Sequence, residues 1–391
     1  MSSESRQVRK EKGGHYPHAL SRLNIGPVSL RNRIVFPAWQ LNYANTDGTV
    51  SGKLMTFFTD LAKGGCGLIF TGPAVVTSDG VPFDRVMHIE DDKYLPGLES
   101  LFASIREQGA TVGVQIIHYG RQSSTSVSRD VLRAPSAIPC PVMSQYDPEY
   151  KVREMTAQDI AEIRAAFIAA AERGAKAGAD IVEVHACHGY LLSEFLSPYS
   201  NKRTDAYGGS VENRTRLIVE ILEGIREKLV NYPNTALGIR VSGDEFVPGG
   251  LVPADFADIV PRLEKAGIDM LDVSAGVYES MPRIVPPREL GPAPHIDIAA
   301  QLKAFSRVPV CAVGSIISPA LEIADSIIAD GKADCCALGR AQMADPEIVN
   351  KSAQGREKEI RKCMHDNACT FWTTGDPEVY CTVNPDYKKR K

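Results

Sequence analysis

The sequence predicts an α/β protein built on one (β/α)8 barrel, or TIM barrel, followed by a short cysteine-containing C-terminal extension. Short apolar runs rich in β-branched residues alternate with longer stretches of helical periodicity, which is typical of βα units on a parallel sheet. Eight such runs follow one another at nearly even spacing. No Gly-x-Gly-x-x-Gly follows the first run, where an open dinucleotide-binding sheet would carry it. A closed barrel therefore fits better than an open sheet.

Each predicted strand is an apolar run that ends near polar or small residues: residues 33–37, 67–71, 111–117, 180–185, 236–241, 270–274, 308–313 and 333–338. Residues 157–177 and 211–229 place apolar side chains at three- and four-residue spacing, which predicts the two longest helices. Ser210 stands directly before the second helix and is expected to cap it. We divide the chain into an N-terminal arm (1–30), the barrel (31–355) and the C-terminal extension (356–391).

Two segments between the strands are expected to shape access to the barrel. Residues 121–150 are rich in Ser, Pro and Arg, which predicts a long loop above the barrel mouth rather than packed structure. Residues 277–290 follow the sixth strand and contain three prolines and Met281. We expect these two segments to determine which substrate the protein accepts.

The composition excludes several classes of function. The chain has 391 residues, 43% hydrophobic and 24% charged, as in an ordinary globular protein. No apolar run reaches the roughly 18 residues of a membrane span, and a net charge of −4 offers no positive field for nucleic acid. The N-terminus lacks the apolar core of a signal peptide, and nine cysteines, an odd number, favour reduced thiols. We expect a cytoplasmic protein that acts on a small molecule.

The densest group of reactive side chains follows the fourth strand, in His185-Ala-Cys-His188-Gly-Tyr190. Working residues of such barrels project from the carboxyl ends of the strands. Two imidazole N–H groups can hold a carbonyl oxygen and stabilise negative charge on it, and a nearby phenol can supply a proton. The same residues also permit two histidines with structural roles or a His-x-x-His metal site, although two histidines without a third ligand support zinc only weakly.

The residues after Tyr190 add a specific resemblance. Leu-Leu-Ser-Glu-Phe-Leu-Ser-Pro (191–198) and Asn-Lys-Arg-Thr-Asp-Ala-Tyr-Gly-Gly-Ser-Val-Glu-Asn-Arg (201–214), together with 185–190, resemble the Old Yellow Enzyme family of flavin-dependent ene-reductases. The similarity runs from Asn32 to Pro346 and covers most of the chain. It implies a TIM barrel that binds FMN.

The resemblance also implies roles for individual residues. Side chains and backbone at the strand ends would surround the flavin ring, namely Pro37, Ala38, Gln40, Gly72, Gln115 and Arg240. A fixed positive charge at Arg240 favours the anionic reduced flavin. The phosphate would be held after the seventh and eighth strands by Gly314, Ser315, Gly339 and Arg340.

The activity that the resemblance implies is a two-stage reduction. NAD(P)H reduces FMN, and flavin N5 then delivers hydride to the β-carbon of an electron-poor alkene such as an α,β-unsaturated carbonyl compound. His185 and His188 would bind the activating oxygen, and Tyr190 would protonate the α-carbon. The expected partners are this small-molecule substrate and further copies of the chain in a homo-oligomer.

The C-terminal cysteines resemble the tail of one branch of the family, that of dienoyl-CoA reductase and trimethylamine dehydrogenase. In that branch four cysteines bind a [4Fe-4S] cluster, and here Cys363, Cys369 and Cys381 would be ligands. The sequence departs from the pattern, because Asp366 stands near the place of the second cysteine and the run is one residue short. Two interpretations remain open. Three thiolates and an aspartate could hold a cluster, or the tail could be degenerate and hold none.

That branch continues into nucleotide-binding domains, which this sequence does not contain. If a cluster is present, a separate electron donor is expected to supply it. Two other functions stay open: an amine dehydrogenase or demethylase, in which aromatic side chains cage a cation, and an electron-transfer subunit. The candidates for such a cage are Trp39, Tyr43, Tyr119 and Tyr278. A barrel without flavin, such as a metal-dependent hydrolase, is the remaining alternative.

Overall fold

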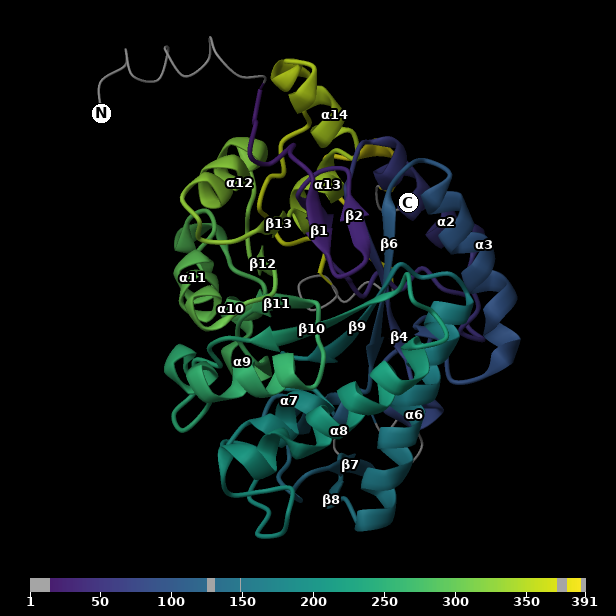
Figure 1. Ribbon diagram of the computed structural model, residues 1–391, viewed down its shortest axis with the longest axis vertical. Helices are drawn as coiled ribbons and strands as arrows, with labels where there is room; N and C mark the ends of the chain where they lie inside the picture. Colours follow the sequence, from purple (N-terminus) through teal and green to yellow (C-terminus); the bar gives the residue numbers. More distant parts are fainter. Residues whose placement is uncertain (1–14, 125–130, 148, 371–377, 388–391) are drawn as a thin grey trace.

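The computed structural model describes residues 15–124, 131–147, 149–370 and 378–387, and it contains the predicted eight-stranded parallel barrel (Figure 1). The strands are β3 (Ile34–Phe36), β4 (Leu68–Val75), β6 (Thr111–Ile117), β9 (Ile181–Ala186), β10 (Ala236–Ser242), β11 (Met270–Ser274), β12 (Val310–Val313) and β13 (Cys335–Ala337). Each pairs in parallel with its neighbours, and β3 pairs with β13 on one side and β4 on the other, which closes the sheet. The predicted fold class is confirmed.

Helices surround the barrel, as Figure 1 shows. They are α2 (Gly52–Lys63), α3 (Leu95–Arg106), α6 (Ala157–Lys176), α7 (Leu191–Leu196), α8 (Val211–Leu229), α9 (Phe256–Lys265), α10 (Met281–Ile284), α11 (Ile296–Phe305), α12 (Ala320–Ala329), α13 (Gly339–Ala344) and α14 (Ile348–Ala353). The two long helices predicted from periodicity are α6 and α8. As expected, Ser210 caps α8, because its hydroxyl accepts a hydrogen bond from the Asn213 N–H (3.2 Å).

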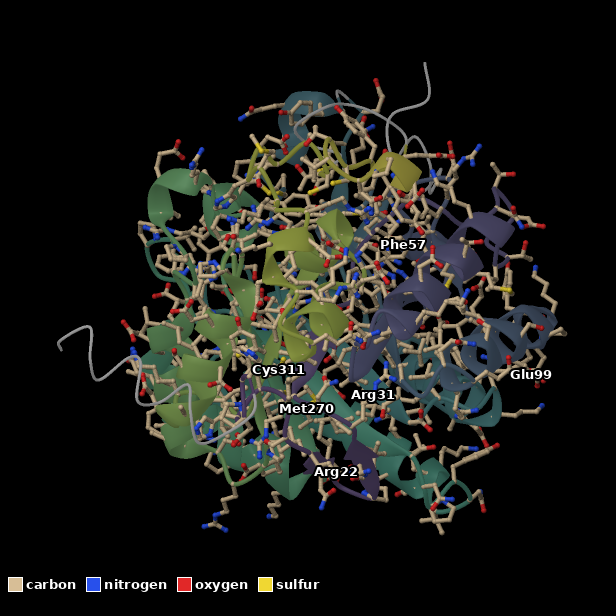
Figure 2. All side chains as sticks on the ribbon, turned by 90° about the horizontal axis from the view of Figure 1, so that it is seen from above. Arg22, Arg31, Phe57, Glu99, Met270 and Cys311 are labelled. Carbon is tan, nitrogen blue, oxygen red and sulfur yellow. The ribbon has the colours of Figure 1, made fainter. Side chains whose placement is uncertain are left out.

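A hairpin closes the end of the barrel at which the strands begin. It consists of β1 (Leu23–Ile25) and β2 (Val28–Leu30), paired antiparallel. Ile25 and Leu30 are fully buried and pack against interior residues of the barrel strands such as Met270. Figure 2 shows Met270 and Cys311 near the middle of the molecule and Glu99 at its edge. Since apolar side chains fill this end, ligands have to enter at the carboxyl ends of the strands.

The segment 121–150 is packed structure in its described part, and the prediction of an unpacked loop was wrong. It contains β7 (Leu132–Ala134) and α5 (Met143–Tyr146), and β7 pairs with β8 (Val152–Glu154). Residues 125–130 and 148 lie outside the described residues. Arg121 is only 2% exposed. Its backbone N–H and the two terminal nitrogens of its guanidinium bond inside the protein, to Glu194, Glu279 and the carbonyls of residues 138 and 139. A hydrophilic composition therefore did not indicate exposure.

The described part of the C-terminal extension packs beside α2. The Tyr387 hydroxyl donates to Asp60 (3.1 Å), and its ring lies 5.1 Å from that of Phe57. The Tyr43 hydroxyl donates to the Val379 carbonyl (2.6 Å). Within the described ranges, no helix has both the length and the apolar character that crossing a bilayer requires.

Candidate active site

One large cavity opens at the carboxyl ends of the barrel strands, and it encloses about 1190 Å³ of empty space including its open mouth. All predicted catalytic and cofactor residues except Gly72 line it: Pro37, Ala38, Gln40, Gln115, His185, His188, Tyr190, Arg240, Gly314, Ser315, Gly339 and Arg340. Gly72, with a φ of +102°, lines a small neighbouring pocket and directly precedes Pro73, which does line the cavity. The strand-end argument for residues 185–190 and the family resemblance for the other residues therefore point to the same cavity.

The two histidines and Tyr190 meet at one side of the cavity. The ring centres of His185 and His188 lie 5.2 Å apart, and that of Tyr190 lies 5.1 Å from His185. Burial and the nearby charge of Arg240 hold the pKa of both imidazoles well below the usual range. Both rings are therefore neutral at physiological pH, and each carries one N–H.

The Ser274 hydroxyl lies between His188 and Arg240 and orients the imidazole ring of His188. The Ser274 hydroxyl lies 2.7 Å from His188 Nε2, and it accepts a long hydrogen bond (3.4 Å) from Arg240. A hydroxyl has one proton and two lone pairs, so it can accept from Arg240 and donate to Nε2 at the same time. We assign this arrangement to His188, which puts its N–H on Nδ1.

Tyr190 is a protonated phenol held by a second tyrosine. Its hydroxyl lies 3.0 Å from that of Tyr278, and its ring packs 4.8 Å from Tyr119. Burial raises the pKa of Tyr190, and the hydrogen bond from Tyr278 acts in the opposite direction by stabilising the phenolate. The pair can therefore deliver a proton into the cavity.

Cys187 is a neighbour of the histidines that the sequence reasoning did not single out. Its sulfur lies 3.3 Å from His188 Nδ1 and 3.4 Å from His185 Nε2. Among the described residues these three form the one group with metal-ligand spacing. The sulfur is also 3.7 Å from the other nitrogen of His185, so it faces the ring rather than one nitrogen lone pair. Burial raises the pKa of the thiol. This is a packing contact and not a preformed ligand set.

A buried cation and an amide lie at the floor of the cavity. Arg240 is 6% exposed, and its Nε lies 3.5 Å from Asp272 Oδ2 without a hydrogen-bond partner in the described structure. The Gln115 amide donates to Glu183 (2.5 Å). The positive charge of Arg240 and the amide of Gln115, both of which line the cavity, suit the pyrimidine edge of a flavin, which offers both acceptors and a donor.

The other end of the cavity suits a phosphate. Gly314 has a φ of +132°, and a Cβ there would lie 2.5 Å from His295 Nδ1. Arg340 donates to the Ser315 and Asn367 side chains and to the Pro286 carbonyl (3.0 Å). Gly314 lines the cavity and carries no side chain, so an anion in the cavity can approach its backbone beside the positive charge of Arg340. The residues present fit FMN.

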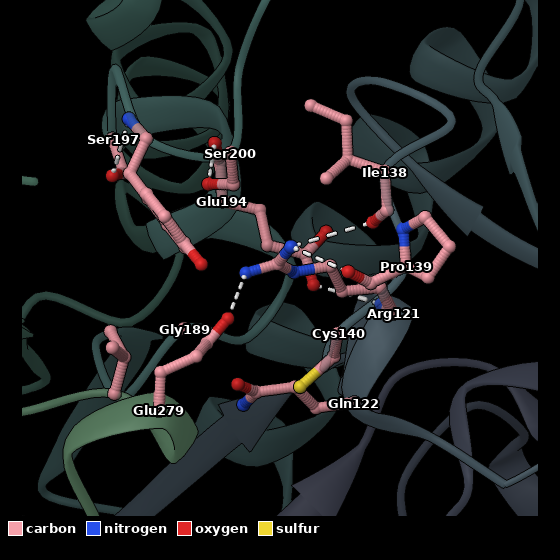
Figure 3. A network of polar contacts seen from close by, with 12 residues as sticks. Arg121, Gln122, Ile138, Pro139, Cys140, Gly189, Glu194, Ser197, Ser200 and Glu279 are labelled. Carbon is pink, nitrogen blue, oxygen red and sulfur yellow. Dashed lines mark hydrogen bonds and ion pairs between the residues drawn. The ribbon is translucent and has the colours of Figure 1, made fainter. Parts of the chain in front are cut away.

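A buried network beside the cavity joins three segments of the chain (Figure 3). Arg121 pairs with Glu279 (2.9 Å), and its backbone N–H donates to Glu194 on α7 (2.8 Å). The Gln122 amide donates to the His188 carbonyl (2.8 Å). Since Glu279 follows Tyr278, the network fixes the position of Tyr278 relative to the histidine segment.

Three of the four aromatic candidates for an amine-binding cage lie at the cavity. Trp39, Tyr119 and Tyr278 line the cavity. Tyr43 does not, because its ring packs against Phe57 and its hydroxyl is bonded to the C-terminal extension. The prediction that Tyr43 belongs to a cage is therefore wrong.

The described residues of the C-terminal extension include the three cysteines and Asp366. Cys369 and Cys381 are buried and Cys363 is half-buried. Asp366 is exposed, and its oxygens accept from the Ala368 N–H (3.1 Å) and the Thr382 hydroxyl (2.7 Å). Among the described residues, Asp366 and the three cysteines do not form a group with metal-ligand spacing.

The fold and this cavity define a flavin oxidoreductase of the TIM-barrel class, and comparison with known proteins confirms the class. Residues 21–359 match the model of the NADH:flavin oxidoreductase / NADH oxidase family. The chain belongs to this family, which confirms the resemblance to Old Yellow Enzyme.

Among curated relatives, NADH oxidase of Thermoanaerobacter brockii is 38% identical over 379 residues (95% of this chain, 56% of the relative). A metal reductase of Desulforamulus reducens is 34% identical (94% and 53%), and NADPH dehydrogenase of Geobacillus thermodenitrificans is 36% identical (82% and 88%). The chain thus spans about half the length of the first two relatives.

Two solved structures are similar over nearly the whole chain. A complex of 2-naphthoyl-CoA reductase has a TM-score of 0.88 at 29% identity and covers 95% of this chain and 57% of its own. Histamine dehydrogenase from Rhizobium sp. 4-9 has a TM-score of 0.84 at 28% identity, covering 95% and 53%.

Proposed function

We propose that this chain binds FMN and uses NAD(P)H to reduce the C=C bond of an electron-poor alkene. The observation that carries the proposal is the convergence of two neutral imidazoles and one protonated phenol on the cavity that Arg240 and Gln115 also line. Oxygen-binding donors and a proton donor are the groups that this reduction needs beside a flavin. The NADPH dehydrogenase relatives support the same reductant.

Each of these residues has its own role in the proposed reaction. His185 and His188 hold the carbonyl oxygen of the substrate and stabilise the negative charge that develops on it. When bound, FMN supplies the hydride that the β-carbon receives. Tyr190 gives its proton to the α-carbon, and the Tyr278 hydroxyl stabilises the phenolate left behind (3.0 Å). Gln115, Arg240, Gly314 and Arg340 hold the cofactor in place.

The experiment is turnover by protein reconstituted with FMN. Under anaerobic conditions, NADPH or NADH should bleach the flavin, and 2-cyclohexenone should restore the oxidised spectrum with one equivalent of saturated ketone. Replacing His185 and His188 together by Ala should weaken binding of a para-substituted phenol, read from its charge-transfer absorbance. A protein that binds no FMN, or a reduced protein that no enone reoxidises, would contradict the proposal.

Amine oxidation is the second candidate, because Trp39, Tyr119 and Tyr278 line the cavity and a ring face attracts a cation. Histamine dehydrogenase and 6-hydroxypseudooxynicotine amine oxidase are among the similar structures. The buried positive charge of Arg240 at the same cavity opposes a cationic substrate. Flavin bleaching by histamine, in the absence of nicotinamide, would favour this candidate over alkene reduction.

We also propose that the three cysteines do not assemble a complete [4Fe-4S] cluster in this chain. Asp366 supports this, because both of its oxygens are bonded within the loop. Iron and acid-labile sulfide in anaerobically purified protein should be far below four per chain. A full complement of iron would contradict this and would point to a separate electron donor.

A further inference from the structure

Two carboxylates lie inside the barrel directly behind the residues that line the cavity floor. Glu183 on β9 is opposite Gln115 on β6, and Asp272 on β11 is opposite Arg240 on β10. Glu183 is fully buried and Asp272 is 1% exposed. The Gln115 amide donates to Glu183 Oε2, and Asp272 pairs with Arg240. Each carboxylate therefore contacts one of the two polar side chains at the cavity floor.

The charges of this layer do not balance when both carboxylates are ionised. Two negative charges then face the single positive charge of Arg240. Glu183 Oε1 and both oxygens of Asp272 have no hydrogen-bond partner among the described residues. An ionised carboxylate in such surroundings loses its hydration without compensation. One proton shared by the two carboxylates makes the layer neutral.

The other groups that face the pair do not take this proton. Burial and the charge of Arg240 lower the pKa of His185, and burial raises that of Cys187. On β12, a hydrogen bond with Cys335 and burial raise the pKa of Cys311. The strands β3, β4 and β13 contribute apolar and thiol side chains to the interior, namely Val35, Phe70, Cys335 and Ala337. The carboxylate pair is thus the site that can change its protonation near neutral pH.

We propose that the Glu183 and Asp272 pair takes up one proton when the flavin above it is reduced, and releases that proton when the flavin is reoxidised. The inference rests on the proposed function, because it needs a flavin beside Arg240 and Gln115. Reduction adds two electrons and one proton to the flavin, which leaves one extra negative charge at the cavity floor. The second proton comes from water and forms an O–H bond on a carboxylate oxygen of the pair. Reoxidation breaks this bond and returns the proton to water.

The direction of the coupling follows from the charges. Burial and repulsion by Asp272 already raise the pKa of Glu183 above its usual range, and burial raises that of Asp272. The negative charge of the reduced flavin raises the affinity of the pair for a proton further. The pair therefore has a higher pKa in the reduced protein than in the oxidised protein. At pH values between these two pKa values, reduction consumes two protons for every two electrons instead of one.

The test is the midpoint potential of FMN-loaded protein, measured electrochemically with mediators from pH 6 to pH 10. In wild type, the slope of midpoint potential against pH should double over an interval of pH that lies above the usual pKa of glutamate. Glu183→Gln and Asp272→Asn should each move this interval to lower pH, because a single carboxylate beside Arg240 no longer faces a like charge. The control is Glu245→Gln, which removes another buried carboxylate outside the barrel interior and should leave the curve unchanged.

An infrared difference spectrum, reduced minus oxidised, provides a second readout. Inside the interval, wild type should gain a protonated-carboxyl band that Glu183→Gln lacks. A constant one-proton slope in wild type, or curves in both variants that match wild type, would overturn the inference. If the protein binds FMN and reduces enones with a constant slope, only this inference fails. If it binds no FMN, the proposed function fails and the inference with it.

Discussion

The hydroxyl oxygens of Tyr190 and Tyr278 lie 3.0 Å apart at the edge of the cavity. Tyr278 comes from the segment after β11, which the ion pair of Arg121 with Glu279 ties to the rest of the site. A phenol that gives up a proton leaves a phenolate, and a neighbouring O–H stabilises this anion. The relationship makes Tyr278 a positioning residue for proton transfer by Tyr190.

Tyr278→Phe should therefore slow reoxidation of the reduced flavin by an enone by about tenfold, the equivalent of one hydrogen bond of about 1.4 kcal/mol. Reduction of the flavin by NADPH should keep its rate, because it needs no phenol. Stopped-flow absorbance measures the two half-reactions separately. Equal slowing of both would mean that Tyr278 only supports the fold.

Ser274→Ala should weaken binding of a para-substituted phenol by about five- to tenfold, because His188 loses the hydrogen bond that places its proton on Nδ1. Ser274→Thr keeps the hydroxyl and should bind the phenol like wild type. Titration of the charge-transfer band gives the dissociation constants. Unchanged binding in Ser274→Ala would contradict the tautomer that we assign.

Gly314→Ala should weaken FMN binding by more than tenfold, because its φ of +132° and the 2.5 Å approach to His295 leave no room for a Cβ. Gly331→Ala is the matched control: Gly331 also has a positive φ (+70°), but a Cβ there would meet no atom within 4 Å. Flavin fluorescence during titration measures both affinities. Similar FMN affinity in the two variants would place the phosphate elsewhere.

Glu194 should make the protein less stable as the pH rises. Burial raises its pKa to about 8, although Arg121 opposes this. A group with a raised folded-state pKa stabilises the folded protein fully below its unfolded pKa, near 4.3, and this contribution is lost as the pH rises toward 8. Glu194→Gln should therefore gain free energy of unfolding relative to wild type between pH 5 and pH 9. Urea unfolding of both proteins at pH 5 and at pH 9 measures these free energies. A difference between variant and wild type that is the same at the two pH values would contradict the prediction.

The continuous apolar runs and the helical periodicity between them were enough to predict the barrel. All eight strands and both long helices occur where the sequence places them, because continuous apolar runs are buried on both faces in a parallel sheet. His185, His188 and Tyr190 were found because working side chains project from strand ends, and the other cavity residues came from the resemblance to Old Yellow Enzyme. The strand-end argument would have found Ser274, which ends the sixth predicted strand.

The buried polar groups were harder to predict. Glu183 shares the strand face of His185, and Asp272 shares that of Ser274, so alternation offered a signal for both. The pairing of Arg121 with Glu279 joins residues 158 positions apart, and no local pattern reports such a contact. The packing of the segment 121–150 depends on these long-range bonds, which is why its composition predicted an exposed loop.

The most direct test of the account compares wild type with Tyr190→Phe in the two anaerobic half-reactions of FMN-loaded protein. We predict that NADPH or NADH bleaches the flavin at similar rates in both. Reoxidation by 2-cyclohexenone should be about 10²- to 10⁴-fold slower in the variant, as for loss of a general acid. Equal reoxidation rates in the two proteins would contradict the assignment of Tyr190, and a wild type that no enone reoxidises would contradict alkene reduction itself.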